Sequence, residues 1–302
     1  MNNKQKLLTA TAITGTIVSA SAFTVFDYAI CRRKKPYLDY VLKEQEWLKE
    51  HQEQELKEIR SKDGLTLRAA YIPRENAKGT IICMHGYHST NDIEFVPEVR
   101  FLWNLGYSIL LPWQRSHGKS EGRYITYGVK ERHDLKRWIL YTNRNLAAKN
   151  KDIFLCGISM GCATTLMAAG LDLPDNVKGI IADCGFTSPW DIIKHVAKER
   201  FHLPPFPLMY MVDLISEVVA GFGLKEVSIP EIMKRNKIPV LFIHGDADDY
   251  VPMWMTIKNY EACASKKELY IVSGAGHALA FSKDMEEGKR RIKNFINKYK
   301  TI

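Results

Sequence analysis

The strongest candidate for nucleophilic chemistry in this sequence is Ser159, at the centre of a G-x-S-x-G pattern at residues 157–161. The apolar run 153–156 precedes the pattern, and a stretch of small residues typical of a helix follows it. A turn from strand to helix this tight leaves no room for side chains at Gly157 and Gly161, and it strains the serine so that its hydroxyl lies at the end of the strand. The context therefore predicts an activated serine rather than an ordinary turn.

A serine hydroxyl reacts efficiently only when a base takes its proton and a carboxylate orients that base. Asp248 follows the apolar run 240–243, and His277 follows the run 269–272. Serine, acid and histidine thus occur in chain order beyond the C-terminal ends of successive apolar runs, where open α/β sheets bind ligands. We therefore predict a catalytic triad of Ser159, Asp248 and His277.

Neighbouring residues offer alternatives for the acid and the base. Asp246 and Asp249 flank the predicted acid and also fit the role of caps for the turn or for the next helix. His244 competes for the role of base. We prefer His277 because its loop is rich in glycine and follows the last apolar run.

Acyl transfer also needs N–H donors for the oxyanion that develops in the transition state. One predicted donor is the amide of Met160, at the start of the helix that follows the serine. The second is the amide of Tyr87, in the loop 85–87 after the apolar run 80–84.

The chain around these residues alternates short apolar runs, typical of buried strands, with amphipathic stretches, typical of helices. This alternation predicts a parallel sheet covered on both faces and entered through an antiparallel hairpin, with strands at 56–59 and 65–69. Residues 189–236 contain helical material and several prolines without a strand, and we interpret them as a small lid. We expect the remaining strands at 80–84, 108–111, 153–156, 179–182, 240–243 and 269–272, and helices at 92–104, 127–146, 160–170, 252–264 and 283–299.

Taken together, the motifs resemble the α/β-hydrolase superfamily, and within it bacterial serine hydrolases of the serine aminopeptidase S33, acyl-peptidase and monoacylglycerol-lipase-like groups. The resemblance covers about residues 55–300 and implies an α/β-hydrolase fold. In that family's pattern, the Asp shortly before Val-Pro and the last His complete the triad, which supports Asp248 and His277. The sequence departs from the pattern at Trp113, where related proteins often carry Asp. The resemblance rests on His85-Gly86-Tyr87, residues 115–122, 157–161 and 244–252, and Gly276-His277.

The N-terminus carries an uncharged stretch, residues 7–26, which as a helix is about as long as a bilayer core is thick. With the basic flank 32–35, this stretch is typical of a single-pass membrane anchor. A signal peptide cleaved after residues 20–22 is the alternative. More basic residues follow the stretch than precede it, so the positive-inside rule favours the cytoplasmic side of the cell membrane for the rest of the chain.

Three segments follow from these patterns. We expect a membrane anchor or signal peptide at residues 1–35, an amphipathic linker helix at 36–54, and an α/β-hydrolase domain at 55–302 with its lid at 189–236.

Composition and charge argue against several other classes of protein. With 46% hydrophobic and 25% charged residues, the chain is typical of a folded globular protein rather than a disordered one. The net charge of +9 is concentrated at 32–35 and 283–300, which gives no support to nucleic-acid binding. The six cysteines include no CxxC pair and are typical of buried thiols. No metal-ligand spacing or nucleotide-binding motif occurs, so we expect neither a metal nor a cofactor.

We therefore expect a serine hydrolase that cleaves carboxylic esters through an acyl-enzyme, with a small ester, a lipid or a peptide as substrate. An S33-like peptidase is one alternative, and acyl transfer to an acceptor other than water is another. A peptide amine would require a carboxylate cluster in the pocket, whereas a lipid chain would require an apolar tunnel. A different class of function is a non-catalytic, membrane-anchored binding protein on the same fold. Such proteins usually lack a triad residue.

Overall fold

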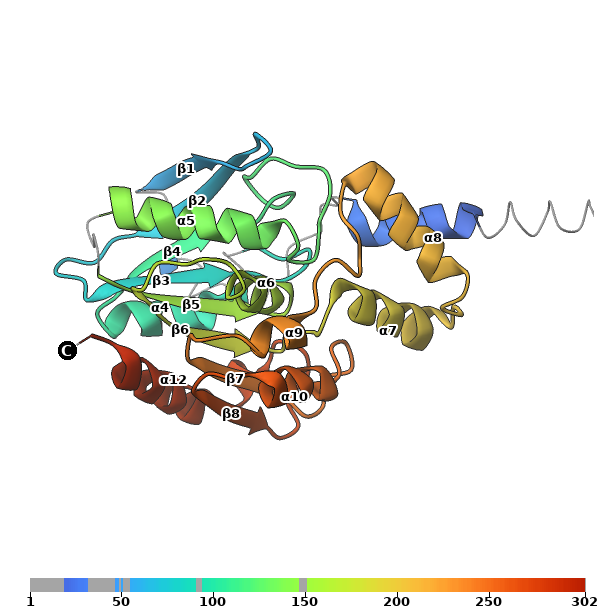
Figure 1. Ribbon diagram of the computed structural model, residues 1–302. Coiled ribbons are helices and arrows are strands. Elements are labelled where there is room, and N and C mark those ends of the chain that lie inside the picture. The colour runs from blue at the N-terminus through green and yellow to red at the C-terminus, as the bar shows by residue number, and fades with distance from the viewer. Residues whose placement is uncertain are drawn as a thin grey trace, which may run out of the picture.

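Short apolar runs that need burial on both faces form the centre of one sheet. The computed structural model describes residues 19–31, 47, 48, 50, 55–90, 94–146 and 151–301 (Figure 1). Its strands are β1 (Leu56–Arg60), β2 (Thr66–Ile72), β3 (Gly79–Met84), β4 (Ser108–Pro112), β5 (Asp152–Ile158), β6 (Val177–Asp183), β7 (Val240–Gly245) and β8 (Lys267–Val272). They pair in the order β1-β2-β4-β3-β5-β6-β7-β8. Strands β3 to β8 are parallel, whereas the β1–β2 hairpin joins β4 in antiparallel fashion.

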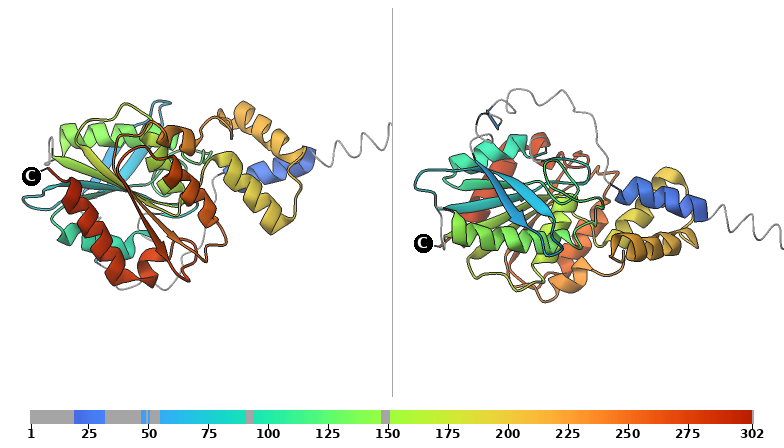
Figure 2. Two further views of the ribbon diagram at one scale, coloured as in Figure 1. Left: turned by 60° about the horizontal axis from the view of Figure 1, so that its bottom comes forward. Right: turned by 90° about the horizontal axis from the view of Figure 1, so that it is seen from above.

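Two layers of helices cover the sheet (Figure 2). One layer contains α5 (Glu131–Asn145), α6 (Met160–Ala168), α9 (Ile229–Met233) and α10 (Met253–Ala262), and the other contains α4 (Val96–Asn104), α11 (Ala280–Lys283) and α12 (Met285–Tyr299). Successive residues of a strand point to opposite faces of a sheet. Accordingly, Ile82 and Leu155 belong to the core under the first layer, and Ile81 and Phe154 to the core under the second.

The predicted alternation of strands and helices is confirmed. Every predicted strand overlaps an observed one, including both strands of the entry hairpin, and the sheet is mostly parallel as expected. The predicted helix at 92–104 corresponds to α4, and part of its first turn, at 92 and 93, lies outside the described residues.

The segment predicted to form a lid is helical, and its helices α7 (Pro189–Phe201) and α8 (Leu208–Ile215) stand away from the sheet, whereas α9 packs against α6 and α10 (Figure 1). Residues 189–236, all of which the structure describes, contain α7, α8, the π-helical turn η2 (Ser216–Ala220) and α9, and no strand. Helical residues 19–30 lie against α7 and α8 (Figures 1 and 2). Ala22, Phe26 and Ile30 are buried there, so this N-terminal segment is part of the packed structure.

The predicted membrane-spanning helix finds no support in the structure. Residues 7–18 of the predicted span and its basic flank 32–35 lie outside the described residues, as does most of the predicted linker 36–54. In the part of the chain that the structure describes, no helix is both long enough and apolar enough to cross a bilayer. Signal-peptide cleavage and the side of the membrane stay predictions.

The loop that departs from the family pattern is shaped by Trp113. Its indole lies directly against Gly118, where an added β-carbon would come within 2.1 Å of the ring. The hydroxyl of Ser120 donates to the carbonyl of Trp113 at 2.5 Å, and the ammonium of Lys119 lies 5.0 Å from the ring centroid. The tryptophan therefore fills the inside of its own loop, with glycine as the residue that makes room for it.

A buried guanidinium connects three elements around this loop. Arg115 makes a bidentate pair with Asp134 of α5, with N–O distances of 2.6 and 2.8 Å, and reaches Asp63 in the β1–β2 turn at 2.8 and 3.1 Å. Burial raises the pKa of Asp134 to about 6, against the opposing effect of Arg115. Arg115 thus holds together the entry hairpin, the loop after β4 and α5.

We predict that Arg115→Met lowers the free energy of unfolding by about 3 kcal/mol, because it leaves the buried carboxylate of Asp134 without a partner. The loss should be larger at pH 8 than at pH 5, since protonation of Asp134 relieves it. Urea titration at both pH values measures the effect. Arg115→Met combined with Asp134→Leu should regain most of the loss, and a double variant as unstable as the single one would show that the ion pair is not the cause.

Candidate active site

Ser159 occupies the turn between β5 and α6 with φ 54° and ψ −115°, a conformation that side chains rarely adopt. Its amide donates to the carbonyl of Asp183 at 2.9 Å. A β-carbon on Gly161 would lie 1.7 Å from the carbonyl oxygen of Met84. A β-carbon on Gly157 would lie 2.4 Å from the carbonyl oxygen of Gly161. Neither position of the elbow therefore has room for a side chain.

The structure brings the three predicted triad residues into one hydrogen-bonded line. Nε2 of His277 lies 2.9 Å from Oγ of Ser159, and Nδ1 of the same ring lies 2.7 Å from Oδ2 of Asp248. The other carboxylate oxygen, Oδ1, accepts the amides of Tyr250 and Val251, each at 2.9 Å. An imidazole held in this way can take a proton from the serine while the carboxylate fixes its orientation.

A second histidine lies behind the carboxylate of Asp248. His244 is fully buried, with Nε2 2.9 Å from the carbonyl of Val251 and 3.4 Å from Oδ2 of Asp248, and with Nδ1 2.7 Å from the hydroxyl of Thr256. Burial acts to raise the pKa of Asp248, but hydrogen bonds from His244 and His277 outweigh it and hold that pKa well below the usual range. His244, which the sequence offered as a rival base, instead supports the acid.

The two rival carboxylates have other partners. Asp246 accepts the amide of Gly274 at 2.6 Å and so braces the glycine-rich loop before His277. Asp249 is exposed, and its carboxylate lies 3.5 Å from the guanidinium of Arg200. These contacts give Asp246 a role in loop structure and leave Asp249 at the surface.

The two predicted oxyanion donors lie on neighbouring strand ends. Met160 begins α6, so its amide belongs to the first helical turn, whose N–H groups lack partners within the helix. Tyr87 lies in the loop after β3, and β3 pairs with β5, with Met84 opposite Gly157. Both amides therefore come from chain segments that leave the sheet at the same edge as Ser159.

The loop that carries Tyr87 is braced by the loop after β4. The amide of His88 donates to Nε2 of His117 at 3.1 Å. The backbone amide of Gln114 donates to Nε2 of His85 at 3.0 Å, and the side-chain amide of Gln114 donates to the carbonyl of His85. These contacts hold the loop on either side of Tyr87, as a preorganised oxyanion site requires.

Aromatic rings gather beside these residues. The ring of Tyr250 lies 5.0 Å from that of His277, and the ring of Tyr87 stacks on that of Tyr127 at 5.2 Å. The ring of Tyr127 in turn lies 6.2 Å from that of Phe186. Burial and the neighbouring Tyr87 and Tyr250 raise the pKa of Tyr127 well above its usual value. We call Tyr87, Tyr127, Phe186 and Tyr250 the aromatic wall.

The N-terminal segment closes onto this wall, which the sequence did not predict. The hydroxyl of Tyr87 donates to the carbonyl of Tyr28 at 3.1 Å, and that of Tyr127 donates to the carbonyl of Ala29 at 3.0 Å. Cys31 forms an antiparallel bridge with Tyr124. Residues 28–31 are therefore part of the surroundings of the site.

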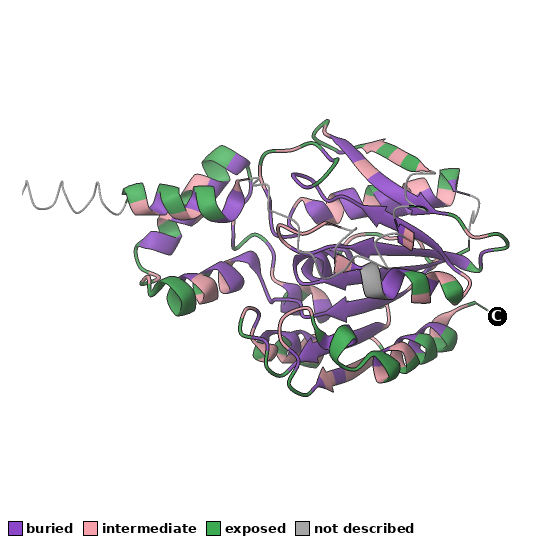
Figure 3. Ribbon diagram, turned by 180° about the vertical axis from the view of Figure 1, so that it is seen from behind, coloured by how far each residue is buried: buried purple, intermediate pink, exposed green. Residues whose placement is uncertain are grey.

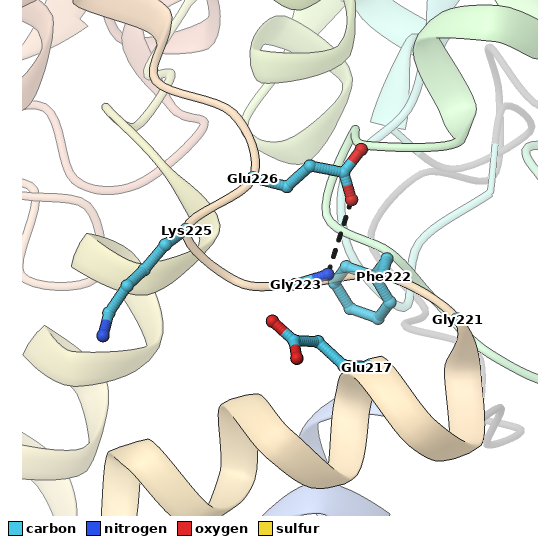
Figure 4. Close-up of a pocket in the computed structure, with 6 residues that line it drawn as sticks. All are labelled: Glu217, Gly221, Phe222, Gly223, Lys225 and Glu226. Atoms are coloured by element: carbon cyan, nitrogen blue, oxygen red, sulfur yellow. Dashed lines mark hydrogen bonds between the residues drawn. The ribbon is translucent and has the colours of Figure 1, made fainter.

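A pocket at the margin of the lid is separate from the triad. It has a volume of about 570 Å³ and is lined by Glu217, Gly221, Phe222, Gly223, Lys225 and Glu226 (Figure 4). The amide of Gly223 donates to the carboxylate of Glu226 across it at 3.4 Å. No triad residue lines this hollow, and we assign it no part in the chemistry.

The triad also supplies two of three groups that could coordinate a metal ion. In the described chain, Cys184, Asp248 and His277 offer ligand atoms within 4.8 Å of one another. Asp248 and His277 are hydrogen-bonded to each other, and burial raises the pKa of the Cys184 thiol well above its usual value. Because a metal requires the thiolate, this set fits a triad better than a metal site.

Three carboxyl groups with raised pKa values lie near the loop 85–87, which carries the predicted donor Tyr87 and which we call the oxyanion loop. Glu94 accepts the amide of Gly86, and burial raises its pKa to about 8. Burial likewise raises the pKa of Glu98 well above its usual value and that of Asp183 to about 6. One oxygen each of Glu98 and Asp183 has no hydrogen-bond partner among the described residues. At neutral pH, burial therefore favours the protonated forms of Glu94 and Glu98.

We predict that the folded protein becomes more stable as the pH falls from 8.5 to 6.5. An acid whose pKa is raised by folding binds more protons in the folded state, so its contribution to stability grows as the pH falls below the folded pKa. Glu98→Gln should flatten this dependence and raise the free energy of unfolding at pH 8.5 by about 2 kcal/mol. Urea titrations of both proteins test this. An unchanged slope in the variant would refute the assignment of Glu98.

Comparisons with known proteins bear on the fold and the family of this chain. YqkD of Bacillus subtilis (strain 168) is 28% identical over 239 residues, which cover 79% of this chain and 78% of that protein. The Pyrococcus furiosus esterase Pf2001 superposes with a TM-score of 0.69 at 24% identity, covering 90% of this chain and 99% of that one. Est1E from Butyrivibrio proteoclasticus, solved with ferulic acid bound, superposes with a TM-score of 0.64 at 19% identity, covering 80% and 98%. These structures establish the α/β-hydrolase fold. Residues 120–301 match the prolyl oligopeptidase family (Peptidase_S9), and since this is more than half of the chain, the protein belongs to that family of α/β-hydrolases.

Proposed function

We propose that this protein is a serine hydrolase that cleaves carboxylic esters with Ser159 as nucleophile. The observation that carries the proposal is the line of hydrogen bonds from Ser159 through His277 to Asp248, at 2.9 and 2.7 Å. The strained backbone of Ser159 and the position of Met160 at the start of α6 add the geometry of an elbow and an oxyanion donor. A non-catalytic binding protein on this fold usually lacks a triad residue, and here every triad position is filled, which argues against that alternative.

In the proposed reaction, Oγ of Ser159 attacks the ester carbonyl as Nε2 of His277 takes its proton. Asp248 accepts Nδ1–H of His277 and stabilises the imidazolium that forms. The amides of Tyr87 and Met160 donate to the oxyanion, and His277 then protonates the leaving alcohol. Water, deprotonated by His277, attacks the acyl-enzyme, releases the acid and restores Ser159.

The side chains around the triad favour an ester with an apolar acyl group. Within the aromatic wall, the ring of Tyr250 lies beside His277, and Tyr87 stacks on Tyr127. Burial raises the pKa values of Glu94, Glu98 and Asp183. A carboxylate cluster for a peptide amine is therefore not formed by these three residues. The similarity to Pf2001, an esterase, supports the same choice.

A peptidase is the second candidate, and the match to the prolyl oligopeptidase family favours it. The same triad, oxyanion donors and acyl-enzyme would serve an amide, with His277 protonating the leaving amine instead of an alcohol. The two candidates differ in which leaving group and acyl group the site accepts.

We predict that Ser159→Ala and His277→Ala each lower kcat/KM for p-nitrophenyl butyrate by at least about a thousandfold, because the residues of a triad act as a unit. For the same reason, the double variant should be about as impaired as either single one. Ser273→Ala and His202→Ala, which replace exposed residues of the same types, serve as matched controls. Full activity in Ser159→Ala would show that another group is the nucleophile.

We predict that p-nitrophenyl esters of short to medium acids are cleaved with kcat/KM at least about a hundredfold above that of aminoacyl p-nitroanilides, because the aromatic wall binds apolar acyl groups. Steady-state kinetics on both series measures the ratio. Equal or faster cleavage of the anilides would overturn the ester assignment and leave the peptidase.

A further inference from the structure

Helix α8 is apolar on two opposite sides. Its inner side buries Leu208, Met209 and Val212 against the lid and the body of the protein. Its outer side carries Tyr210, Leu214 and, in the adjoining turn η2, Val218, spaced four residues apart and so aligned along one face. A helix at a protein surface normally has one apolar face and one polar face.

Exposed residues recur along the helices of the lid (Figure 3), and the outer residues of α8 and η2 are among them. Leu214 is 59% exposed and Val218 is 76% exposed. The ring of Phe206, also exposed, lies 6.0 Å from that of Tyr210, which extends this set of residues past the start of α8. We call Phe206, Tyr210, Leu214 and Val218 the outer lid face. A cluster of large apolar side chains in water usually marks a surface that is covered in use.

The N-terminal segment of the chain indicates what covers the outer lid face. Helical residues 19–30 lie against α7 and α8, with Phe23 exposed (Figures 1 and 2). The described helix begins at Ser19, and residues 7–18, which precede it in the sequence, carry no charge. In the sequence, twelve uncharged residues thus directly precede a helix that packs against α8 (Figure 1). These residues and the outer lid face both suit the apolar interior of a bilayer better than water.

Polar groups at the border of this face fit a bilayer surface. The ammonium of Lys225 lies 3.8 Å from the ring centroid of Trp190 and 4.1 Å from that of Tyr210. Tyrosine, tryptophan and lysine with apolar stems and polar tips are suited to the level of lipid head groups. Asp213, the neighbour of Leu214, is paired with Lys225 at 3.8 Å, so this lysine offers little free charge to a lipid head group and apolar contact is the main attraction.

We propose that the outer lid face docks onto the surface of a lipid bilayer, with Leu214 and Val218 inserted among the acyl chains. This interaction is separate from ester hydrolysis, because neither residue belongs to the triad, the oxyanion loop or the aromatic wall. It places the lid at the membrane surface.

Binding of the full chain to vesicles of phosphatidylcholine with a minor share of phosphatidylglycerol tests the proposal. Leu214→Glu should weaken sedimentation with these vesicles by at least about tenfold, because it puts a charge among acyl chains. Leu56→Glu, on the edge strand β1, is the matched control, since Leu56 is 51% exposed and undergoes the same change. The control should bind as the parent does. Equal binding by parent and both variants, or equal loss in both, would overturn the proposal.

A site-specific probe gives a second measurement. An environment-sensitive fluorophore on Val218→Cys should shift to shorter wavelength and be quenched by brominated lipids when these vesicles are added, whereas the same probe on Leu56→Cys should not. The signal of the parent chain, treated equally, corrects for labelling of Cys31, the cysteine that is partly exposed. A Val218 probe that stays in water on bound protein would contradict insertion.

Two further controls separate this proposal from other causes. Leu214→Glu should cleave a soluble ester at the parent's rate, which shows that the variant is folded. Sedimentation velocity should find the parent and Leu214→Glu in the same oligomeric state. A parent dimer that Leu214→Glu dissociates would show that a second copy covers the outer lid face and would overturn the proposal of a bilayer.

Discussion

The site depends on a close approach between two backbones, the start of α6 and the end of β3. At Gly161 the approach is so close that a β-carbon would overlap the carbonyl oxygen of Met84. The same turn forces Ser159 to a positive φ, a strain that costs about 1–3 kcal/mol. The entirely buried helix α6, packed between the sheet and α5, offsets this cost. The strained turn brings the nucleophile and both predicted oxyanion donors to the same edge of the sheet.

The ionisation of the carboxyl groups near this edge depends on how many hydrogen-bond donors surround each of them. Asp248 is surrounded by donors, two backbone amides and two histidines, so it stays ionised although it is buried. Glu94 and Glu98 have too few donors to offset burial, so their pKa values rise and they favour the neutral form. One carboxylate therefore faces His277 as a charge, while its buried neighbours add little negative charge near neutral pH. The number of donors, rather than the residue type, distinguishes the acid of the triad.

The sequence predicted those features that depend on residues close together in the chain. The strands, the elbow glycines and the order of Ser159, Asp248 and His277 all follow from apolar runs and from the turns that end them. The support of Asp248 by His244 was missed, because it depends on how a loop folds back on its strand. The bond from Tyr127 to Ala29 was also missed, since it joins residues 98 positions apart. Hydropathy likewise could not show that Ala22 and Phe26, within the uncharged stretch, are buried against protein.

Covalent labelling of Ser159 tests the central claim most directly. A fluorophosphonate reacts with an activated serine and leaves a stable adduct, which mass spectrometry of proteolytic fragments can assign to one residue. The geometry predicts a single adduct on Ser159, lost in Ser159→Ala and slowed by at least about a hundredfold in His277→Ala, where the general base is missing. A folded protein that takes up no label, or labels equally fast in His277→Ala, would contradict an activated nucleophile at the elbow.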